Sequence, residues 1–328
     1  MQAGSTSSHG NARIPRVSLP DGRPLPGYLR ALRRGLSGPR PLRKLLELAT
    51  PRLVAPHLPD LLFRYEDGRA FHLPASPGPY AQIFTQGEFE PGESDAVRAL
   101  LRPGDFVVDV GANLGWFTLL MAEAVEPDGE VWAVEPMPPI LPALRRNLAL
   151  NESLDVRPFE VALGDRTGVA EIHVFSGLPH GHASTSTLDR SDYTAHEVAL
   201  TTLDVLLDGR VPTFVKLDVE GSELAVLRGA AKTCAAECPP IWMIEVNYET
   251  SAAFGFRPAD LLAGLGDAFV FRIGEPGLVR ELDPEAAPHG VNWIVVPSCH
   301  EDRVPATGSR PRPGRARPAQ RDEAQEPA

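Results

Sequence analysis

Short apolar runs and amphipathic stretches alternate along the chain from residue 106 onward. The apolar runs predict strands at 106–110, 130–135, 156–162, 213–218 and 241–246, and the stretches between them predict helices at 115–125, 138–150, 203–208 and 222–235. In the first run, Phe106, Val107 and Val108 are apolar at neighbouring positions, a pattern typical of a strand buried on both faces. The order predicts an α/β fold with a doubly wound, mostly parallel sheet, which binds ligands at the carboxyl ends of its strands.

The chain on either side of this pattern predicts smaller units. Segments 269–273 and 291–296 predict an antiparallel pair that closes the sheet, and 93–101 predicts a helix ahead of it, so that the main domain covers 81–298. Residues 27–80 predict an extension with short basic helices at 28–36 and 41–48 and a hairpin, because Asp67-Gly68 separates the strand-like runs 61–66 and 69–73. Residues 1–26 and 299–328 are rich in polar residues, Pro and Arg, and we expect a disordered basic arm and a disordered tail.

The first predicted strand runs into a sharp turn of small residues, Asp109-Val110-Gly111-Ala112-Asn113-Leu114-Gly115. Glycines let the backbone approach a ligand, and the helix that follows offers free N–H groups. A carboxylate just before the turn would repel a pyrophosphate, but it suits a cationic ligand such as S-adenosylmethionine (SAM). About twenty residues later a second strand ends in Glu135, where the carboxylate can bind a ribose diol. The two features predict a nucleotide site of the SAM type.

The chain resembles the FkbM family of SAM-dependent methyltransferases between about residues 80 and 297. The motifs that carry the resemblance are Asp109 to Gly115, Val134-Glu135-Pro136, Ala162-Leu163-Gly164-Asp165, Thr202-Leu203-Asp204 and Lys216 to Glu223. It implies a Rossmann-like class I methyltransferase that methylates a hydroxyl of a sugar or natural-product small molecule. The implied cofactor contacts are Asp109, Gly111, Ala112, Asn113 and Gly115 at the methionine end, Glu135 at the ribose, and Leu163, Gly164 and Asp165 at the adenine. A plain turn role for Asp165 stays open.

Carboxylates gather at the tips of the later strands. Asp218 and Glu220 follow the fourth strand and would face a ligand, a cation or Lys216; we expect Asp218 at the junction of cofactor and acceptor and Glu220 as base or acceptor ligand. Glu245 at the fifth tip is a further catalytic candidate. Magnesium held by Asp218, Glu245 and Asn247 is an alternative, although no metal is our expectation.

Three other residues are candidates for the site. His180 and His182 lie in a long polar loop that resembles a lid, and His182 is included as a candidate base because imidazole titrates near neutral pH. A mobile surface loop is the alternative for both. Glu90 either lies near the cofactor or is a solvated carboxylate at a helix entry. His173 lies in a strand-like run and is expected to be structural.

Charge and cysteine content bound the partners and the location. The net charge is −11, yet residues 1–60 carry ten Lys/Arg against three Asp/Glu. This arm lacks interleaved aromatics, so we expect it to pack on its own domain rather than bind nucleic acid. No long apolar segment predicts a membrane span or a leader, and three cysteines do not suggest a disulfide framework, so we expect a cytoplasmic protein with thiols at Cys234 and Cys238. A homo-oligomer is compatible with the sequence.

Two other functions are compatible with parts of the pattern. A dinucleotide-dependent oxidoreductase would share the strand and turn, but Asp109 and the glycine spacing argue against it. A SAM-binding module without catalysis would keep the turn, and the carboxylates at Asp218 and Glu220 argue against that function.

Overall fold

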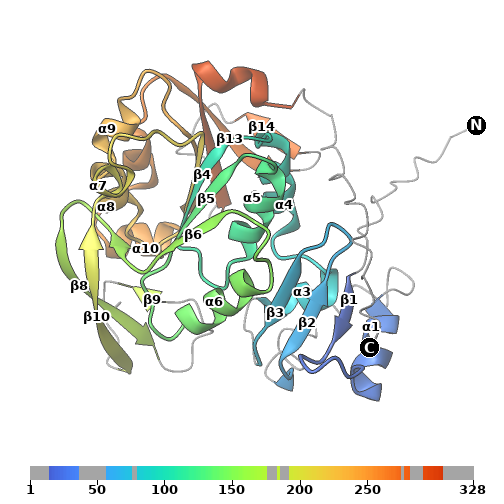
Figure 1. Ribbon diagram of the computed structural model, residues 1–328. Coiled ribbons are helices and arrows are strands. Elements are labelled where there is room, and N and C mark those ends of the chain that lie inside the picture. Colours follow the sequence, from blue (N-terminus) through green and yellow to red (C-terminus); the bar gives the residue numbers. More distant parts are fainter. Residues whose placement is uncertain are drawn as a thin grey trace, which may run out of the picture.

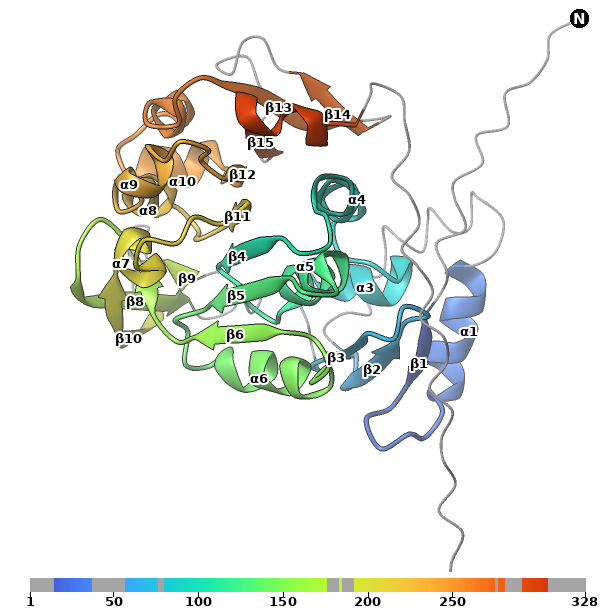
Figure 2. The ribbon, with the colours of Figure 1, turned by 45° about the horizontal axis from the view of Figure 1, so that its top comes forward.

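The computed structural model describes residues 15–36, 57–75, 80–175, 183–184, 192–274, 277–280 and 291–305. Its centre is an eight-stranded sheet in the order β14-β13-β15-β12-β11-β4-β5-β6. Figure 1 labels β4, β5, β6, β13 and β14 of this sheet, and Figure 2 labels all eight strands. The strands are β4 (Phe106–Val110), β5 (Glu130–Val134), β6 (Val156–Phe159), β11 (Phe214–Leu217), β12 (Ile241–Val246), β13 (Ala268–Gly274), β14 (Gly277–Arg280) and β15 (Val291–Pro297). β4, β5, β6, β11 and β12 are parallel, and β13, β14 and β15 form the antiparallel end. The predicted fold class and closing pair are confirmed.

Both faces of the sheet are apolar, as the continuous apolar runs predict. On β4, Val107 belongs to one core cluster, whereas Val108 and Val110 belong to the other. The first cluster includes residues of α3 (Ala81–Gln86), α4 (Pro91–Leu100) and α5 (Trp116–Val125), and the second includes residues of α7 (Leu203–Leu207), α8 (Glu223–Arg228) and η3 (Pro258–Leu262). Figure 2 shows α4 and α5 on the opposite side of the central strands from α7 and α8. The main domain also contains helices α6 (Leu141–Ala149) and α10 (Tyr248–Ala253).

Two predicted elements are each divided in the structure. The predicted helix 222–235 is α8 followed by α9 (Ala231–Cys234), with a break at Gly229, where a Cβ would lie 1.9 Å from the carbonyl oxygen of Gly164. The predicted strand 156–162 ends at Phe159, and Ala162–Leu163 forms β7 in a separate sheet of order β7-β10-β8-β9. In that sheet β8 (Gly168–Phe175) and β10 (Tyr193–Thr201) form a long antiparallel pair, and β9 (Ala183–Ser184) pairs with β8.

The described residues of the N-terminal extension form a three-stranded sheet and the helix α1 (Gly27–Leu36). The predicted hairpin is present as β2 (Leu61–Arg64) and β3 (Ala70–Leu73), and helix α1 matches the predicted helix 28–36, whereas the predicted helix 41–48 lies outside the described residues. The prediction of disorder through residue 26 is wrong for residues 15–26, because β1 (Arg16–Ser18) pairs with the free edge of β2 and Leu25 is buried. Residues 1–14 are outside the described part of the chain.

Two asparagines on α6 and its end attach this small sheet to the main domain. The side chain of Asn151 accepts from the N–H of Ala70 at 2.8 Å and donates to the Ala70 carbonyl at 2.7 Å. One helical turn earlier, Asn147 makes the same pair of bonds with His72, at 2.6 and 3.1 Å. Residues 70 and 72 present their backbone groups on the same edge of β3. The two asparagine side chains lie one helical turn apart on one face of α6 and its end, so their amides can bond to this edge as the backbone of a neighbouring strand would.

The C-terminal residues are ordered further than predicted. The predicted disordered tail begins at residue 299, but Ser298–Arg303 form the 3₁₀ helix η5 and the Arg303 guanidinium binds both carboxylate oxygens of Asp105, at 2.6 and 2.9 Å. Residues 306–328 lie outside the described residues.

The expectation of free thiols holds for buried Cys234 and is wrong for Cys238, which forms a disulfide with Cys299, 61 residues away. The cysteines therefore no longer support a cytoplasmic location. Among the described residues, no helix has both the length and the apolar character that crossing a membrane requires.

The Asn147 amide is a test of how the extension is attached. Asn147→Ala leaves the N–H and carbonyl of His72 and the carbonyl of Leu114 without their buried partner, so we expect the free energy of unfolding to fall by about 3 kcal/mol. Arg145→Ala on the same helix removes only an exposed ion pair with Glu160 and should cost no more than about 0.5 kcal/mol. Urea unfolding of both variants measures the difference, and equal losses would contradict the role of the amide.

Candidate active site

A cavity of about 220 Å³ opens at the carboxyl ends of β4, β5, β11 and β12, where a doubly wound sheet binds ligands. Its walls come from the strand tips and from segments 80–90, 136–140 and 161–172. The lining residues are Tyr80, Phe89, Glu90, Asp109, Val110, Gly111, Ala112, Asn113, Phe117, Val134, Glu135, Pro136, Met137, Ile140, Val161, Ala162, Leu163, Ile172, Lys216, Asp218, Val219, Glu220, Ser222 and Glu245. Most of the residues predicted to bind a cofactor or act in catalysis therefore meet in one cavity.

The turn after β4 has a backbone shape that depends on glycine. Gly111 has φ +83°, and a Cβ there would lie 1.8 Å from the carbonyl oxygen of Asp218. Gly111 and Ala112 donate their N–H groups to the carbonyl of Val134, which ties the turn to the tip of β5. Gly115, with φ +87°, begins α5, and a Cβ there would lie 2.8 Å from Leu144. Gly115 thus shapes the turn without lining the cavity.

Asp109 is a buried carboxylate with one oxygen unpaired. Its side chain is 1% exposed, and Oδ2 accepts a hydrogen bond from the Thr118 hydroxyl at 2.6 Å. The other oxygen, Oδ1, is buried with no hydrogen-bond partner, and so is Oδ1 of Asn113. Burial raises the pKa of Asp109, although the nearby Lys216 ammonium opposes that shift. Both residues line the cavity, and each has one buried side-chain oxygen without a hydrogen-bond partner.

Glu135 holds the turn as well as facing the cavity. Its Oε2 accepts from the N–H of Asn113 at 2.8 Å, and its Oε1 accepts from the N–H of Met137 at 2.9 Å. Burial raises the pKa of Glu135 to about 7. Asn113 has φ +51°, a left-handed conformation that non-glycine residues rarely adopt, and this hydrogen bond helps to hold it. Each oxygen of Glu135 keeps a second lone pair for a ligand.

At the tip of β11 an ion pair lies beside the turn. The Lys216 ammonium is 2.6 Å from Oδ2 of Asp218 and 4.9 Å from the ring centre of Phe117. Burial alone would lower the pKa of Lys216, but the charges of Asp218 and Asp109 raise it, so the amine stays charged. Lys216 lies beside Asp109 in the β4–β11 register.

The segment after Asp218 forms the next part of the wall. Buried Glu223 accepts from the N–H groups of Val219 and Gly221, both at 3.1 Å, and so fixes the turn that carries Glu220. Glu220 has φ +54° and lines the cavity. Non-glycine residues in this conformation concentrate at functional sites, and Glu90, Asn113 and Glu220 are three such residues in one cavity.

Glu245 on β12 completes a group of acids. The charge of Asp218 and then burial raise the pKa of Glu245 to about 10, so its carboxyl is protonated at neutral pH. The alternative of magnesium at Asp218, Glu245 and Asn247 finds little support in this arrangement, because Asp218 already holds the Lys216 ammonium.

The opposite wall comes from the segment just before α4. Tyr80 and Phe89 stack with ring centres 4.4 Å apart, and Glu90 follows them with its pKa raised to about 7 by burial. Of the two alternatives for Glu90, the structure favours a place in the cavity. Tyr80 and Ile172 were not among the predicted site residues, since nothing in their sequence neighbourhood separates a cavity wall from an ordinary core.

The remaining predicted residues do not all lie at the cavity. Leu163 lines the cavity, whereas Gly164 does not, and Asp165 is exposed and pairs with Arg166. His180 and His182 lie outside the described residues. His173 is buried on β8, beside Glu171 at 2.8 Å and the Tyr193 ring at 4.3 Å, which agrees with a structural role.

The sheet order, the glycine turn and the acid at the second strand tip define a Rossmann-like nucleotide-binding enzyme. The model of the methyltransferase FkbM domain matches residues 109–269. The chain is 30% identical over 181 residues to the methyltransferase sdnD of Sordaria araneosa. The match covers 46% of this chain and 67% of that protein. The chain therefore belongs to the FkbM family of SAM-dependent methyltransferases.

The chain has two further matches to known proteins. The chain is 32% identical over 159 residues to the 31-O-demethyl-FK506 methyltransferase FkbM of Streptomyces tacrolimicus, a match that covers 39% of this chain and 60% of that protein. It spans less than two thirds of that relative. It is also similar to the crystal structure of the methyltransferase FkbM from Methylobacillus flagellatus KT, with 16% identity, a TM-score of 0.42, and coverage of 81% of this chain and 57% of that one.

The raised pKa of Glu245 has a consequence for stability. The unfolded chain loses this proton near pH 4.5, but the folded chain keeps it up to about pH 10. Stability should therefore fall as pH rises between these values, by at most about 1.4 kcal/mol per pH unit from this group. Glu245→Gln mimics the protonated acid, so relative to this variant the wild type should lose stability between pH 6 and pH 9. Urea unfolding at both pH values tests this, with exposed Glu152→Gln as control, and parallel pH slopes for wild type and Glu245→Gln would contradict the assignment.

Proposed function

We propose that this chain transfers the methyl group of SAM to a hydroxyl of a natural-product or sugar-like small molecule. The observation that carries the proposal is that Asp109 and Asn113 both line the cavity and each has a buried side-chain oxygen without a hydrogen-bond partner. An α-ammonium group is a donor with three N–H bonds and a positive charge, so it would satisfy both atoms and offset the buried carboxylate. The residues present therefore fit the methionine end of SAM.

The rest of the cofactor would lie along the cavity toward β5. The free lone pairs of Glu135 would accept hydrogen bonds from a ribose diol. Leu163, Val161 and Ile140 line that end of the cavity and offer apolar surface to an adenine ring. Because Asp165 is exposed outside the lining, a hydrogen bond from adenine to its side chain receives no support.

When bound, the sulfonium supplies an activated methyl group. The work of the chain is then to position the acceptor and take its proton. Asp218 is held by Lys216 between the cofactor turn and Glu220, so it is suited to orient an acceptor hydroxyl. Glu220 is the proposed base. Glu245, protonated at neutral pH, would act as a hydrogen-bond donor to the acceptor.

Two arguments support a hydroxyl of a small molecule as acceptor. The Streptomyces relative is named for 31-O-demethyl-FK506, an acceptor methylated at oxygen. The lining of the cavity includes Tyr80, Phe89 and Ile172, which suit an apolar scaffold, and carboxylates that suit a hydroxyl that must lose a proton. No nucleic-acid partner, no membrane partner and a cytoplasmic location remain our expectations.

Asp109 tests the cofactor site. Asp109→Asn keeps the shape of the side chain and removes the charge, so we expect SAM affinity to fall by about 100-fold. Calorimetric titration measures it, with SAM and NAD each tested with Mg²⁺ and with EDTA. Exposed Asp208→Asn is the matched control and should bind SAM as the wild type does. Unchanged affinity in Asp109→Asn, or binding of NAD in place of SAM, would overturn the cofactor assignment.

Glu220 tests the catalytic assignment. We expect Glu220→Gln to lower kcat by about 100-fold with less than about a threefold change in SAM affinity, because general-base help is lost while the cradle remains. Transfer from labelled SAM to a panel of hydroxylated natural products is the assay. Glu90→Gln is the comparison, since Glu90 also lines the cavity and burial raises its pKa to about 7. A larger loss of kcat in Glu90→Gln would move the base to Glu90, and full activity of Glu220→Gln would exclude Glu220.

A further inference from the structure

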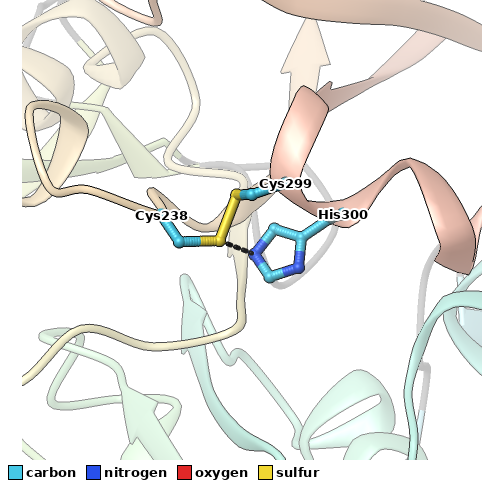
Figure 3. Close-up of side chains that lie close together, drawn as sticks. All are labelled: Cys238, Cys299 and His300. Atoms are coloured by element: carbon cyan, nitrogen blue, oxygen red, sulfur yellow. Dashed lines mark hydrogen bonds between the residues drawn. A yellow bond between two sulfur atoms is a disulfide. The ribbon is translucent and has the colours of Figure 1, made fainter.

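Cys238, Cys299 and His300 form a cluster at the far end of the sheet from the cavity. Cys238 lies just before β12, and the other two residues lie in η5 just after β15 (Figure 3). Glu245, at the other end of β12, is seven residues from Cys238, which corresponds to about 20 Å along a strand. The cluster is therefore separate from the proposed methyl-transfer site.

The register of the sheet brings the two cysteines together. β12 and β15 are antiparallel, with Trp242 opposite Val295. Four residues back from Trp242 is Cys238, and four residues on from Val295 is Cys299, so continuing the ladder makes the cysteines opposite partners. Because the backbone hydrogen bonds of β12 and β15 set this position, reduction of the disulfide leaves the two thiols facing each other.

A nitrogen ligand lies beside the sulfurs. Nε2 of His300 is 3.4 Å from Sγ of Cys238, and one donor atom from each of the three residues lies within 4.8 Å of the others. In a tetrahedral zinc site, bonds of about 2.3 Å to sulfur and 2.0 Å to nitrogen put neighbouring S and N ligands about 3.5 Å apart. The His300 ring also hydrogen-bonds the backbone of Pro239, as histidine ligands commonly do with a backbone carbonyl.

We propose that Cys238, Cys299 and His300, in the dithiol state, bind a thiolate-preferring divalent cation of the Zn²⁺ class, and that the disulfide is the metal-free state of the same site. Both cysteines reach solvent, so ion and oxidant have access, and a water molecule can complete the tetrahedron. Binding releases the two thiol protons to solvent. Oxidation of the metal-bound state by a small-molecule disulfide moves two electrons from the two cysteine sulfurs to the oxidant, which takes up two protons from solvent and becomes two thiols, and the ion leaves.

Either state joins the same two segments. The link connects the loop before β12 to η5, whose Arg303 binds Asp105 just before β4. The ion and the disulfide are thus alternative cross-links at one end of the sheet, and they exclude each other because both use the two sulfur atoms.

Cobalt is a spectroscopic probe for this site. The full chain, reduced with a phosphine and kept without oxygen, is titrated with Co²⁺ and then with Zn²⁺. We expect one Co²⁺ per chain, with thiolate-to-cobalt absorption and tetrahedral ligand-field bands that Zn²⁺ abolishes. Protein oxidised with a small-molecule disulfide should show no such bands.

Variants identify the ligands. Cys299→Ser should lose the thiolate bands, and His300→Gln should weaken Co²⁺ binding by at least about tenfold. Cys234→Ser is the matched control, because Cys234 is a buried free thiol outside the cluster, and its spectrum should equal that of the wild type. Circular dichroism verifies that each variant is folded. Absence of thiolate bands in the reduced wild type, or full binding by Cys299→Ser, would overturn the proposal and leave a plain structural disulfide.

Discussion

The close approach of β4 and β11 is the constraint on which the site depends. The turn after β4 passes so near the end of β11 that a Cβ on Gly111 would lie 1.8 Å from the Asp218 carbonyl. Only a residue without a side chain allows this contact, and the positive φ of Gly111 also favours glycine. The contact brings the acid before the turn, Asp109, to the same cavity as the ion pair of Lys216 and Asp218. The turn after β4 and the tip of β11 are thereby one structural unit.

This arrangement concentrates negative charge in a site of low polarity. Six carboxyl groups line the cavity, and among its described lining residues Lys216 is the one Lys or Arg side chain. The chain meets the cost of burying them in part by raising pKa values, to about 7 at Glu90 and Glu135 and to about 10 at Glu245. A cationic cofactor would relieve the same repulsion. The binding free energy of such a ligand would therefore include the loss of electrostatic repulsion between these carboxyl groups.

The N-terminal extension contributes to this site indirectly. The asparagine pair on α6 attaches β3 to the main domain, and Trp116 at the start of α5 packs edge-to-face on Tyr65 and Phe71 of the extension. The segment between the extension and α4 then supplies Tyr80, Phe89 and Glu90 to the cavity wall. A unit that looks accessory in the chain is thus packed against the helix that follows the cofactor turn.

The sequence alone determined the sheet, the closing antiparallel pair, the hairpin and the two motifs that meet in the cavity, because these depend on local apolar runs, turn residues and short spacings. It could also place Asp109, Glu135 and Asp218 at strand tips, since parallel strands end on one edge. Tertiary structure decided the rest. The pairing of Cys238 with Cys299, the order of residues 15–26, the Asn147 and Asn151 contacts and the wall at Tyr80 all join residues far apart in the chain. Such contacts depend on strand register and on which edge is free, and no local pattern of residues encodes either.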